Sequence, residues 1–456
     1  MTPRRFLVCL ALAAFAFSFS VSASADEAKK PNIIFIMADD LGYADIGSYG
    51  APDAKTPHID SLAVDGLKFT NFYAMSCQCT PSRTAILTGR YPQRAGGLEC
   101  AIGTGNVGRY DEAEALAAKG ELGLPAEYAV LAPALKGVGY VNGVFGKWHL
   151  GYEPKFSPLE QGFDRFTGFL GGNVEYFEHY ETSGLDVYVK GREPIDREGY
   201  LTDLITEDAV AFLDERAAEP DTPFFLYLPH GAPHFPFQGP GDREPKRTAE
   251  NWMDGTRINY VAMLESLDDG VGKVLEALEK NGQAENTIVI FTSDHGAMEP
   301  GLNTPWRDYK STTFEGGLRV PCVVRWPGKI EPGTVSHQVG TLMDLTASFL
   351  QIAGTEAPDQ KPLDGIDILG HVLDGKPEMP RTLYWRYRRG DKTWWGARDG
   401  NLKLVRKQEG DAVEEWLFDL ATDPTETKSV TSERPEEYGA LQRKVLLWEK
   451  EVRPWR

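Results

Sequence analysis

Residues 32–40 read Asn-Ile-Ile-Phe-Ile-Met-Ala-Asp-Asp, a continuous apolar run that ends in two carboxylates. An apolar run of this length without polar alternation is typical of a strand buried on both faces, as in a parallel sheet. Asp39 and Asp40 follow it directly, at the place where a buried strand reaches the edge of its sheet. The segment therefore predicts a central strand with a functional site at its carboxyl end.

Strands of the same kind and helical stretches alternate along the next 300 residues. Further strands are predicted at 224–228, 287–292 and 320–325. Helices are predicted between them, at 56–65, 131–136, 202–216, 257–280 and 342–352. This alternation indicates an α/β domain built around a large, mostly parallel sheet flanked by helices.

The sequence changes character after about residue 375. Short aromatic or β-branched runs at 382–388, 393–398, 402–406 and 415–420 are separated by Gly-Asp, Asp-Gly and Glu-Gly-Asp turns. They predict a small antiparallel sheet, closed by a helix near residues 435–451. We therefore expect a catalytic α/β domain over residues 26–375 and a C-terminal antiparallel subdomain over residues 376–456.

The first 25 residues carry two arginines, an apolar stretch and Ala23-Ser24-Ala25 before Asp26. This pattern predicts a secretory signal peptide over residues 1–25 and an exported protein, either periplasmic or extracellular. The apolar stretch is short for a membrane span, and no later segment is long and apolar enough to be one. We therefore expect no membrane span.

The composition limits the classes of partner. With a formal net charge of −19, the chain is not expected to bind nucleic acid through a basic surface. Of its five cysteines, Cys9 would leave with the signal peptide. At most one disulfide is expected among the rest once Cys79 is set aside, and Cys77 with Cys100 is the candidate pair.

Residues 77–90 read Cys-Gln-Cys-Thr-Pro-Ser-Arg-Thr-Ala-Ile-Leu-Thr-Gly-Arg. Thr80 is a suitable N-cap and Pro81 a suitable first helical residue, so a helix is predicted to begin there. Cys79 would then lie at the positive end of the helix, and Arg83 would return over the same face. The segment predicts a site for a small tetrahedral oxyanion.

Other chemically active side chains follow strands or lie in loops. They occur in Gly146-Lys147-Trp148-His149-Leu150-Gly151, in Pro233-His234-Phe235-Pro236, in Ser293-Asp294-His295-Gly296, and at Lys310 before Thr312-Thr313-Phe314-Glu315-Gly316-Gly317. Asp39, Asp40 and Asp294 would repel one another at one sheet edge. A divalent cation would resolve that repulsion, and oxygen-rich ligation suits Ca²⁺ or Mg²⁺.

Cys79-Thr80-Pro81-Ser82-Arg83, followed by Leu87-Thr88-Gly89-Arg90, resembles the signature of the formylglycine-dependent (type I) sulfatases, which belong to the alkaline phosphatase superfamily. The segments around His149, His234, Asp294 and Lys310, and residues 416–424, also look like this family. The resemblance covers essentially the whole mature chain. It implies an alkaline-phosphatase-like fold and a sulfuric ester hydrolase that releases inorganic sulfate.

The resemblance also implies roles for these residues. A formylglycine-generating maturation enzyme would oxidise Cys79 to an aldehyde, whose hydrate attacks sulfur with one oxygen and eliminates sulfate with the other. His234 with Lys310 would face the leaving oxygen, and His149 with Lys147 would serve the residue-79 hydroxyl, although these two roles could be exchanged. Arg83 would supply fixed positive charge.

The implied metal ligands are Asp39, Asp40, the residue at Cys79, Asp294 and His295. The family more often has Asn at the last position, and imidazole favours softer metals than calcium. The carboxylates still make Ca²⁺ the expected ion, and because of the imidazole, Mg²⁺ or another divalent ion is left open.

Three functions and two substrate classes remain open at this point. A phosphoester or phosphonate hydrolase on the same fold is the alternative enzyme, and a glycan-binding protein with a degenerate site is the non-enzymatic alternative. A sulfated carbohydrate is preferred over an aryl sulfate ester, because secretion favours extracellular polymers. Specificity is expected in loops 97–124 and 171–197, where an aromatic cluster could stack on a sugar or aryl ring: Tyr176, Phe177, His179 and Tyr180.

Two weaker signals complete the sequence analysis. His230 is a lesser candidate, expected to support the site or to face the substrate. Residues 103–108 satisfy the Gly-x-Gly-x-x-Gly pattern, but neither a strong strand before them nor an acid-ended strand after them is predicted. They are therefore expected to form a loop near the mouth of the site.

Overall fold

The computed structural model describes residues 29–103, 109–184 and 187–454. The predicted signal peptide at 1–25 and most of the glycine-rich run at 103–108 lie outside these ranges. No helix within them is long and apolar enough to cross a membrane.

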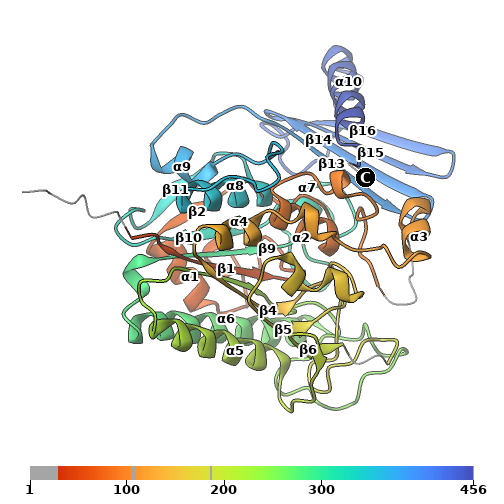
Figure 1. Cartoon of the computed structure of the whole chain (residues 1–456). Helices are drawn as coiled ribbons and strands as arrows, with labels where there is room; N and C mark the ends of the chain where they lie inside the picture. Colours follow the sequence, from red (N-terminus) through yellow and green to blue (C-terminus); the bar gives the residue numbers. More distant parts are fainter. Residues whose placement is uncertain (1–28, 104–108, 185–186, 455–456) are drawn as a thin grey trace, which may run out of the picture.

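A ten-stranded sheet forms the centre of the molecule (Figure 1). Its strands are β1 (Asn32–Ala38), β2 (Leu67–Phe69), β4 (Val141–Lys147), β5 (Arg165–Phe169), β6 (Tyr188–Lys190), β7 (Glu193–Pro194), β8 (Phe224–Pro229), β9 (Thr287–Ser293), β10 (Cys322–Arg325) and β11 (Thr334–Ser336). Their order is β11-β2-β10-β9-β1-β8-β4-β5-β6-β7. Strands β9, β1, β8, β4 and β5 are parallel neighbours, which confirms the mostly parallel sheet. β10 runs antiparallel to β9 and β2, so it differs in direction from the other predicted strands.

Helices cover both faces of this sheet (Figure 1). One layer contains α2 (Cys79–Thr88), α4 (Leu131–Gly137) and α8 (Leu342–Ala353), and the other contains α1 (Pro57–Val64), α5 (Leu201–Ala217) and α6 (Arg257–Lys280). Alternate residues of β1 enter the two cores: Ile33 and Phe35 face the α2 layer, while Ile34 and Ile36 face the α5 layer. Burial on both faces explains why this strand is apolar without alternation.

The remaining α-helices and strands are short. They are α3 (Asp111–Ala117), α7 (Glu315–Leu318), α9 (Ile368–Leu373) and the two-stranded pair β3 (Phe72–Tyr73) with β12 (Gly340–Thr341).

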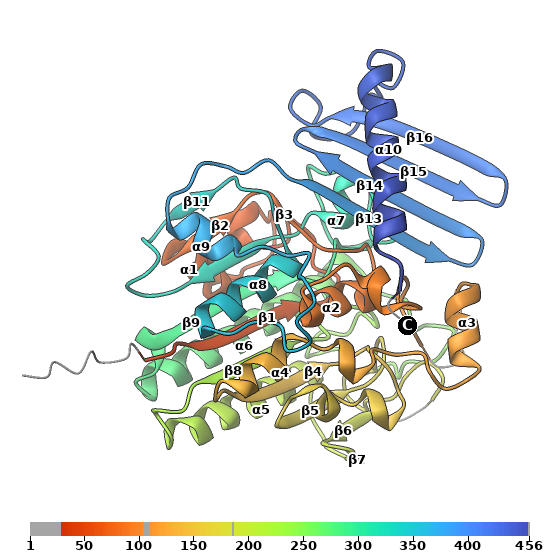
Figure 2. The same ribbon diagram turned by 45° about the horizontal axis from the view of Figure 1, so that its top comes forward.

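A separate antiparallel sheet follows at the C-terminal end, as predicted (Figure 2). It consists of β13 (Thr382–Arg389), β14 (Lys392–Asp399), β15 (Leu402–Glu409) and β16 (Ala412–Asp419), in that order. Helix α10 (Pro435–Glu451) packs on one face through Leu441 and Val445. The other face packs against the main body through Trp385 and Trp394.

Helix α2 begins two residues before the predicted start. Gln78 is its N-cap and Cys79 its first helical residue. The Thr80 hydroxyl instead donates to the carbonyl oxygen of His149 at 3.0 Å and accepts from the Ile102 N–H at 3.2 Å. The N-cap prediction for Thr80 is therefore wrong, because this hydroxyl joins two loops of the site.

The predicted disulfide is also wrong. Cys77 and Cys100 are both free and buried within the same hydrophobic core. Burial raises the pKa of each thiol to about 12, so both are neutral apolar packing groups at ordinary pH.

Candidate active site

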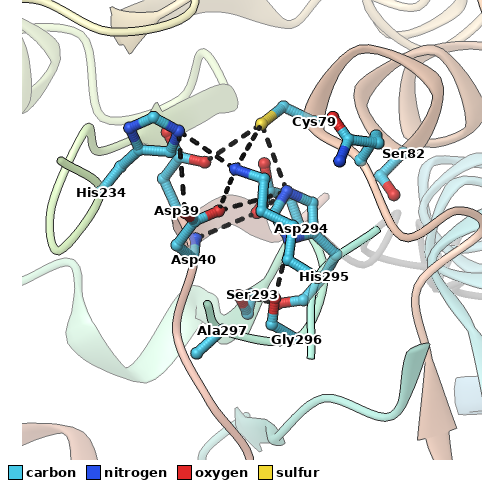
Figure 3. Close-up of polar contacts among 12 residues, drawn as sticks. Asp39, Asp40, Cys79, Ser82, His234, Ser293, Asp294, His295, Gly296 and Ala297 are labelled. Atoms are coloured by element: carbon cyan, nitrogen blue, oxygen red, sulfur yellow. Dashed lines mark hydrogen bonds and ion pairs between the residues drawn. The ribbon is translucent and has the colours of Figure 1, made fainter. Parts of the chain in front are cut away.

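Four neighbouring parallel strands bring the predicted site residues together (Figure 3). Asp39 and Asp40 follow β1, Asp294 and His295 follow β9, and Lys147 is the last residue of β4. His149 and His234 lie in the loops after β4 and β8. Because the carboxyl ends of parallel strands meet at one edge, residues up to 256 positions apart surround a single point.

Cys79 lies at the centre of this group. Its Sγ is 3.2 Å from His295 Nε2, 3.5 Å from Asp39 Oδ1 and 3.8 Å from Lys310 Nζ. Burial alone would raise the pKa of its thiol, but Lys147 and Lys310 hold that pKa well below its ordinary value. Position 79 is therefore one where the protein stabilises negative charge.

Four side chains form a donor set suited to a divalent cation. Asp39, Asp40, Cys79 and His295 each offer one ligand atom, and these atoms all lie within 4.8 Å of one another. Asp40 Oδ2 is buried and accepts no hydrogen bond from the described residues. Asp294 lies beside this set, with Oδ1 3.5 Å from His295 Nε2. Two of the four donors are carboxylates and Asp294 adds a third nearby, so the residues fit a hard divalent ion, while the imidazole nitrogen and the sulfur are donors that softer ions also accept.

Arg83 anchors the carboxylates. Its Nη2 is 3.1 Å from Asp294 Oδ2 and 3.8 Å from Asp39 Oδ1, and its Nη1 donates to the carbonyl oxygen of Lys147 at 3.0 Å. Burial and the nearby Asp39 nevertheless raise the pKa of Asp294 to about 7. Arg83 therefore holds two parts of the site in place: the carboxylate of Asp294 and the backbone of Lys147, the last residue of β4.

The two lysines pair with different carboxylates of the site. Lys147 forms an ion pair with Asp39, and both side chains are fully buried. Lys310 Nζ lies 2.6 Å from Asp40 Oδ1 and 3.1 Å from His234 Nε2. Each of the two carboxylates that follow β1 thus has a fixed positive charge beside it.

The two histidines present different atoms. His234 Nδ1 donates to the Phe235 carbonyl oxygen at 2.7 Å, which leaves Nε2 facing Lys310. His149 Nε2 donates to the Ile102 carbonyl oxygen at 2.6 Å. Burial, assisted by Lys147, lowers the pKa of His149 to about 4, so this ring is neutral at ordinary pH.

A cavity of about 510 Å³ opens from this group. Cys79, His149, His234 and Lys310 line it together with Tyr152, Asn173 and Glu181 from the loops after β4 and β5. Tyr387 and Arg389 of β13 complete it. This contribution of the C-terminal sheet was not predicted from the sequence, since neither residue belongs to a local motif.

The predicted aromatic cluster does not line this cavity. Tyr176 stacks on Tyr200 and donates to the His234 carbonyl oxygen at 3.0 Å, and Phe177 also packs on Tyr200. His179 and Tyr180 pack on Tyr188 and Trp252. The stacking prediction is therefore wrong. The four rings pack against other aromatic side chains of the protein, and polar residues of the same loop line the cavity.

The two weaker predictions concern His230 and the glycine-rich run. His230 is fully buried, does not line the cavity, and neither ring nitrogen has a hydrogen-bond partner among the described residues. Its predicted substrate-facing role is wrong, because its side chain, just after β8, is enclosed in the interior. Gly103, the one described residue of the glycine-rich run, lines the cavity.

Comparison with known proteins gives consistent matches. Residues 31–355 match the Sulfatase family, and residues 304–450 match the C-terminal region of N-sulphoglucosamine sulphohydrolase. The chain is 36% identical to the N-acetylgalactosamine-6-sulfatase of Mus musculus over 381 residues, covering 79% of this chain and 70% of that protein. For the Homo sapiens protein of the same name the identity is 37% over 380 residues, covering 79% and 69%.

Solved structures agree. The structure of Ps i-CgsB in complex with k-i-k-neocarrahexaose superposes with a TM-score of 0.79 at 30% identity, covering 92% of this chain and 93% of that chain. The PsFucS1 sulfatase from Pseudoalteromonas sp. gives a TM-score of 0.72 at 27% identity, covering 93% and 90%. With its family match over most of the chain and the predicted alkaline-phosphatase-like fold confirmed, this protein belongs to the sulfatase family and is a sulfatase.

Proposed function

We propose that this sulfatase hydrolyses a sulfate ester on a carbohydrate. A cavity of about 510 Å³ is large enough for a sugar and far larger than a sulfate ion. Asn173, Tyr152 and Glu181 supply polar groups of the kind that bind sugar hydroxyls. Two of the relatives are named N-acetylgalactosamine-6-sulfatase, and one solved structure is a complex with k-i-k-neocarrahexaose, so N-acetylgalactosamine 6-sulfate is the first substrate to test.

The observation that carries this proposal is that Cys79, Lys310 and two histidines line one cavity, with Lys147 buried against Asp39. A maturation enzyme would convert Cys79 to formylglycine, whose hydrate supplies the nucleophilic oxygen for attack on sulfur. His234 and Lys310, 3.1 Å apart, are placed to protonate the leaving alcohol. His149, neutral and near residue 79, is placed to accept a proton from it when sulfate leaves.

We propose that Asp39, Asp40, His295 and residue 79 hold a divalent cation, with Asp294 beside them. The ion would neutralise negative charge on the sulfate oxygens. Ca²⁺ is the proposed ion because two of the four donors are carboxylates and the carboxylate of Asp294 lies beside them, and Mg²⁺ is the nearest competitor.

Export and the division into domains are further proposals. The sequence supports a signal peptide at residues 1–25, and extracellular glycans are then accessible substrates. We place the catalytic domain at 26–375 and the C-terminal subdomain at 376–456, since the antiparallel sheet begins at Thr382.

The test combines maturation state and turnover. Protein purified from its own host is analysed for the mass of the peptide 69–83 and assayed on N-acetylgalactosamine 6-sulfate, on the matching phosphate ester and on an aryl sulfate. We expect an aldehyde at position 79 and release of sulfate from the sugar. Faster turnover of the phosphate ester would replace this proposal with a phosphoester hydrolase.

A Cys79→Ala variant provides the residue-level prediction. We expect turnover to fall at least about 10³-fold with little change in melting temperature, because the nucleophile is lost while the helix is kept. Cys77→Ala is the matched control, since Cys77 is buried two residues earlier, and it should retain activity. Activity retained by Cys79→Ala would refute the assigned nucleophile.

A further inference from the structure

A second cavity, of about 460 Å³, adjoins the first. Both cavities are lined by Ser311, Tyr387 and Arg389. The remaining walls of the second cavity come from Thr312 and from the C-terminal sheet: Asp391, Lys392, Trp394, Lys407 and Glu409. The active-site cavity therefore continues past Ser311 onto the C-terminal sheet.

Strand register explains which side chains form this wall. Tyr387 pairs with Trp394, and Arg389 pairs with Lys392 across β13 and β14. Trp394 and Lys392 pair in turn with Lys407 and Glu409 of β15. Directly opposite residues project to the same face, so all six share the face that looks toward Ser311. The opposite face carries Ala397 and Leu404, which pack on α10.

The cationic side chains on this face differ in whether a carboxylate lies beside them. Lys392 lies 3.1 Å from Glu409, and Lys407 lies 3.3 Å from Glu409 and 3.4 Å from Glu414. Arg389, which lines both cavities and is exposed, forms no ion pair with any carboxylate in the described part of the chain. Its guanidinium is therefore the cation at the junction whose charge is not already matched.

We propose that the second cavity binds the sugar adjacent to the one that carries the scissile sulfate, and that Arg389 binds an acidic group on that neighbouring sugar. A guanidinium suits this role because its planar donors match a carboxylate or a sulfate in bidentate fashion. The inference rests on the proposed carbohydrate function and extends it. The preferred substrate is an acidic oligosaccharide, and a single sulfated sugar fills only part of the site.

The kinetic test compares substrates of two lengths. Arg389→Ala is assayed on N-acetylgalactosamine 6-sulfate and on a chondroitin 6-sulfate tetrasaccharide, in which an acidic sugar adjoins the sulfated one. We expect kcat/KM to fall about 10- to 100-fold on the tetrasaccharide, mainly through KM, the range expected for a hydrogen bond to a charged group. Activity on the monosaccharide should change less than about twofold, because that substrate does not reach the junction.

Arg443→Ala is the matched control, because Arg443 is an exposed arginine on α10 that lines neither cavity. It should leave both activities unchanged. Equal losses on the two substrates in Arg389→Ala, or no loss on either, would overturn the inference.

A binding test separates this inference from the proposed function and identifies the acidic group. In the Cys79→Ala background, affinity for the tetrasaccharide and for its carboxyl-reduced form is measured by calorimetry, with and without Arg389→Ala. An Arg389 effect confined to the native form assigns a carboxylate, and an effect on both forms assigns the neighbouring sulfate. Affinity independent of Arg389 for both forms overturns the inference. If Arg389-dependent binding persists while matured wild-type protein releases no sulfate, the proposed function fails and the binding site stands.

Discussion

At the scale of single residues, two of the site's side chains depend on an unusual backbone. Asp40 and His149 both adopt positive φ, at 61° and 58°, where residues with a side chain are strained by about 1–3 kcal/mol. Each is held by neighbours: the Asp40 N–H donates to Asp294 Oδ1 at 3.4 Å, and the His149 N–H donates to the Leu170 carbonyl oxygen at 3.1 Å. The two residues lie just beyond β1 and β4, where they bring a carboxylate and an imidazole to the site.

His230 predicts a loss of stability in mild acid. Burial lowers its pKa to about 3, so the folded protein keeps the ring neutral while the unfolded chain binds a proton below its ordinary pKa of 6.5. Stability contributed by this residue is therefore complete above pH 6.5 and declines as the pH falls toward 3. At pH 5 the loss is about 2 kcal/mol relative to neutral pH.

Urea denaturation of wild type and His230→Leu at pH 7.5 and pH 5 checks this expectation. The variant should lose about 2 kcal/mol less than wild type between the two pH values. His337→Leu, a change at an exposed histidine, should behave as wild type does. The same pH dependence in His230→Leu and wild type would contradict the assignment.

At the scale of elements, the start of α1 is stabilised by a carboxylate from another helix. Its N-cap, Thr56, makes no capping hydrogen bond to the helix. Asp268 of α6 instead accepts the N–H of Ile59 at 2.8 Å and that of His58 at 3.2 Å. A carboxylate 209 positions away in sequence thus satisfies donors that a local cap would ordinarily satisfy.

Substituting Asp268 by Ala should lower the free energy of unfolding by about 1–2 kcal/mol, because two N–H groups at a helix start lose their acceptor. Thermal or chemical denaturation measures the change. Asp269→Ala, at the exposed neighbouring position, should cost less than about 0.5 kcal/mol. Equal effects of the two substitutions would show that the contact between Asp268 and α1 does not contribute to the free energy of unfolding.

At the scale of the whole molecule, a buried ion cluster joins the C-terminal sheet to the main body. Lys403 of β15 lies 2.7 Å from Glu315 Oε1 and 3.1 Å from Glu426 Oε1, and all three side chains are fully buried. Glu315 begins α7, five residues after Lys310. The cluster therefore fixes the sheet that carries Arg389 relative to the loop that carries Lys310.

Lys403→Met should destabilise the protein by about 3–5 kcal/mol, because two buried carboxylates lose their shared cation. Burial and the neighbouring Glu315 raise the pKa of Glu426 to about 7 even with Lys403 nearby. Chemical denaturation is the measurement, with Lys407→Met in the same strand as the control, expected to cost less than about 1 kcal/mol. If Lys403→Met were no more destabilising than the control, the cluster would not hold the sheet in place.

Much of the site was predictable because its residues follow recognisable local patterns. The apolar run before Asp39, the Thr-Pro-Ser-Arg run after Cys79 and the polar residues after β9 each carry their own signal. Parallel packing then needs no further information to bring them together, since the carboxyl ends of such strands share an edge. The C-terminal sheet was equally predictable from the alternation of its strands and from its turns.

Other features depended on packing between distant segments. The direction of β10, the free thiols of Cys77 and Cys100, and the inward rings of Tyr176 and Phe177 have no local signal, because each is decided by what lies across the interface. The place of Arg389 in the cavity depends likewise on how the C-terminal sheet docks. Periodicity and motifs thus determined the elements and the chemistry of this protein, while tertiary packing alone decided which other side chains line the cavity.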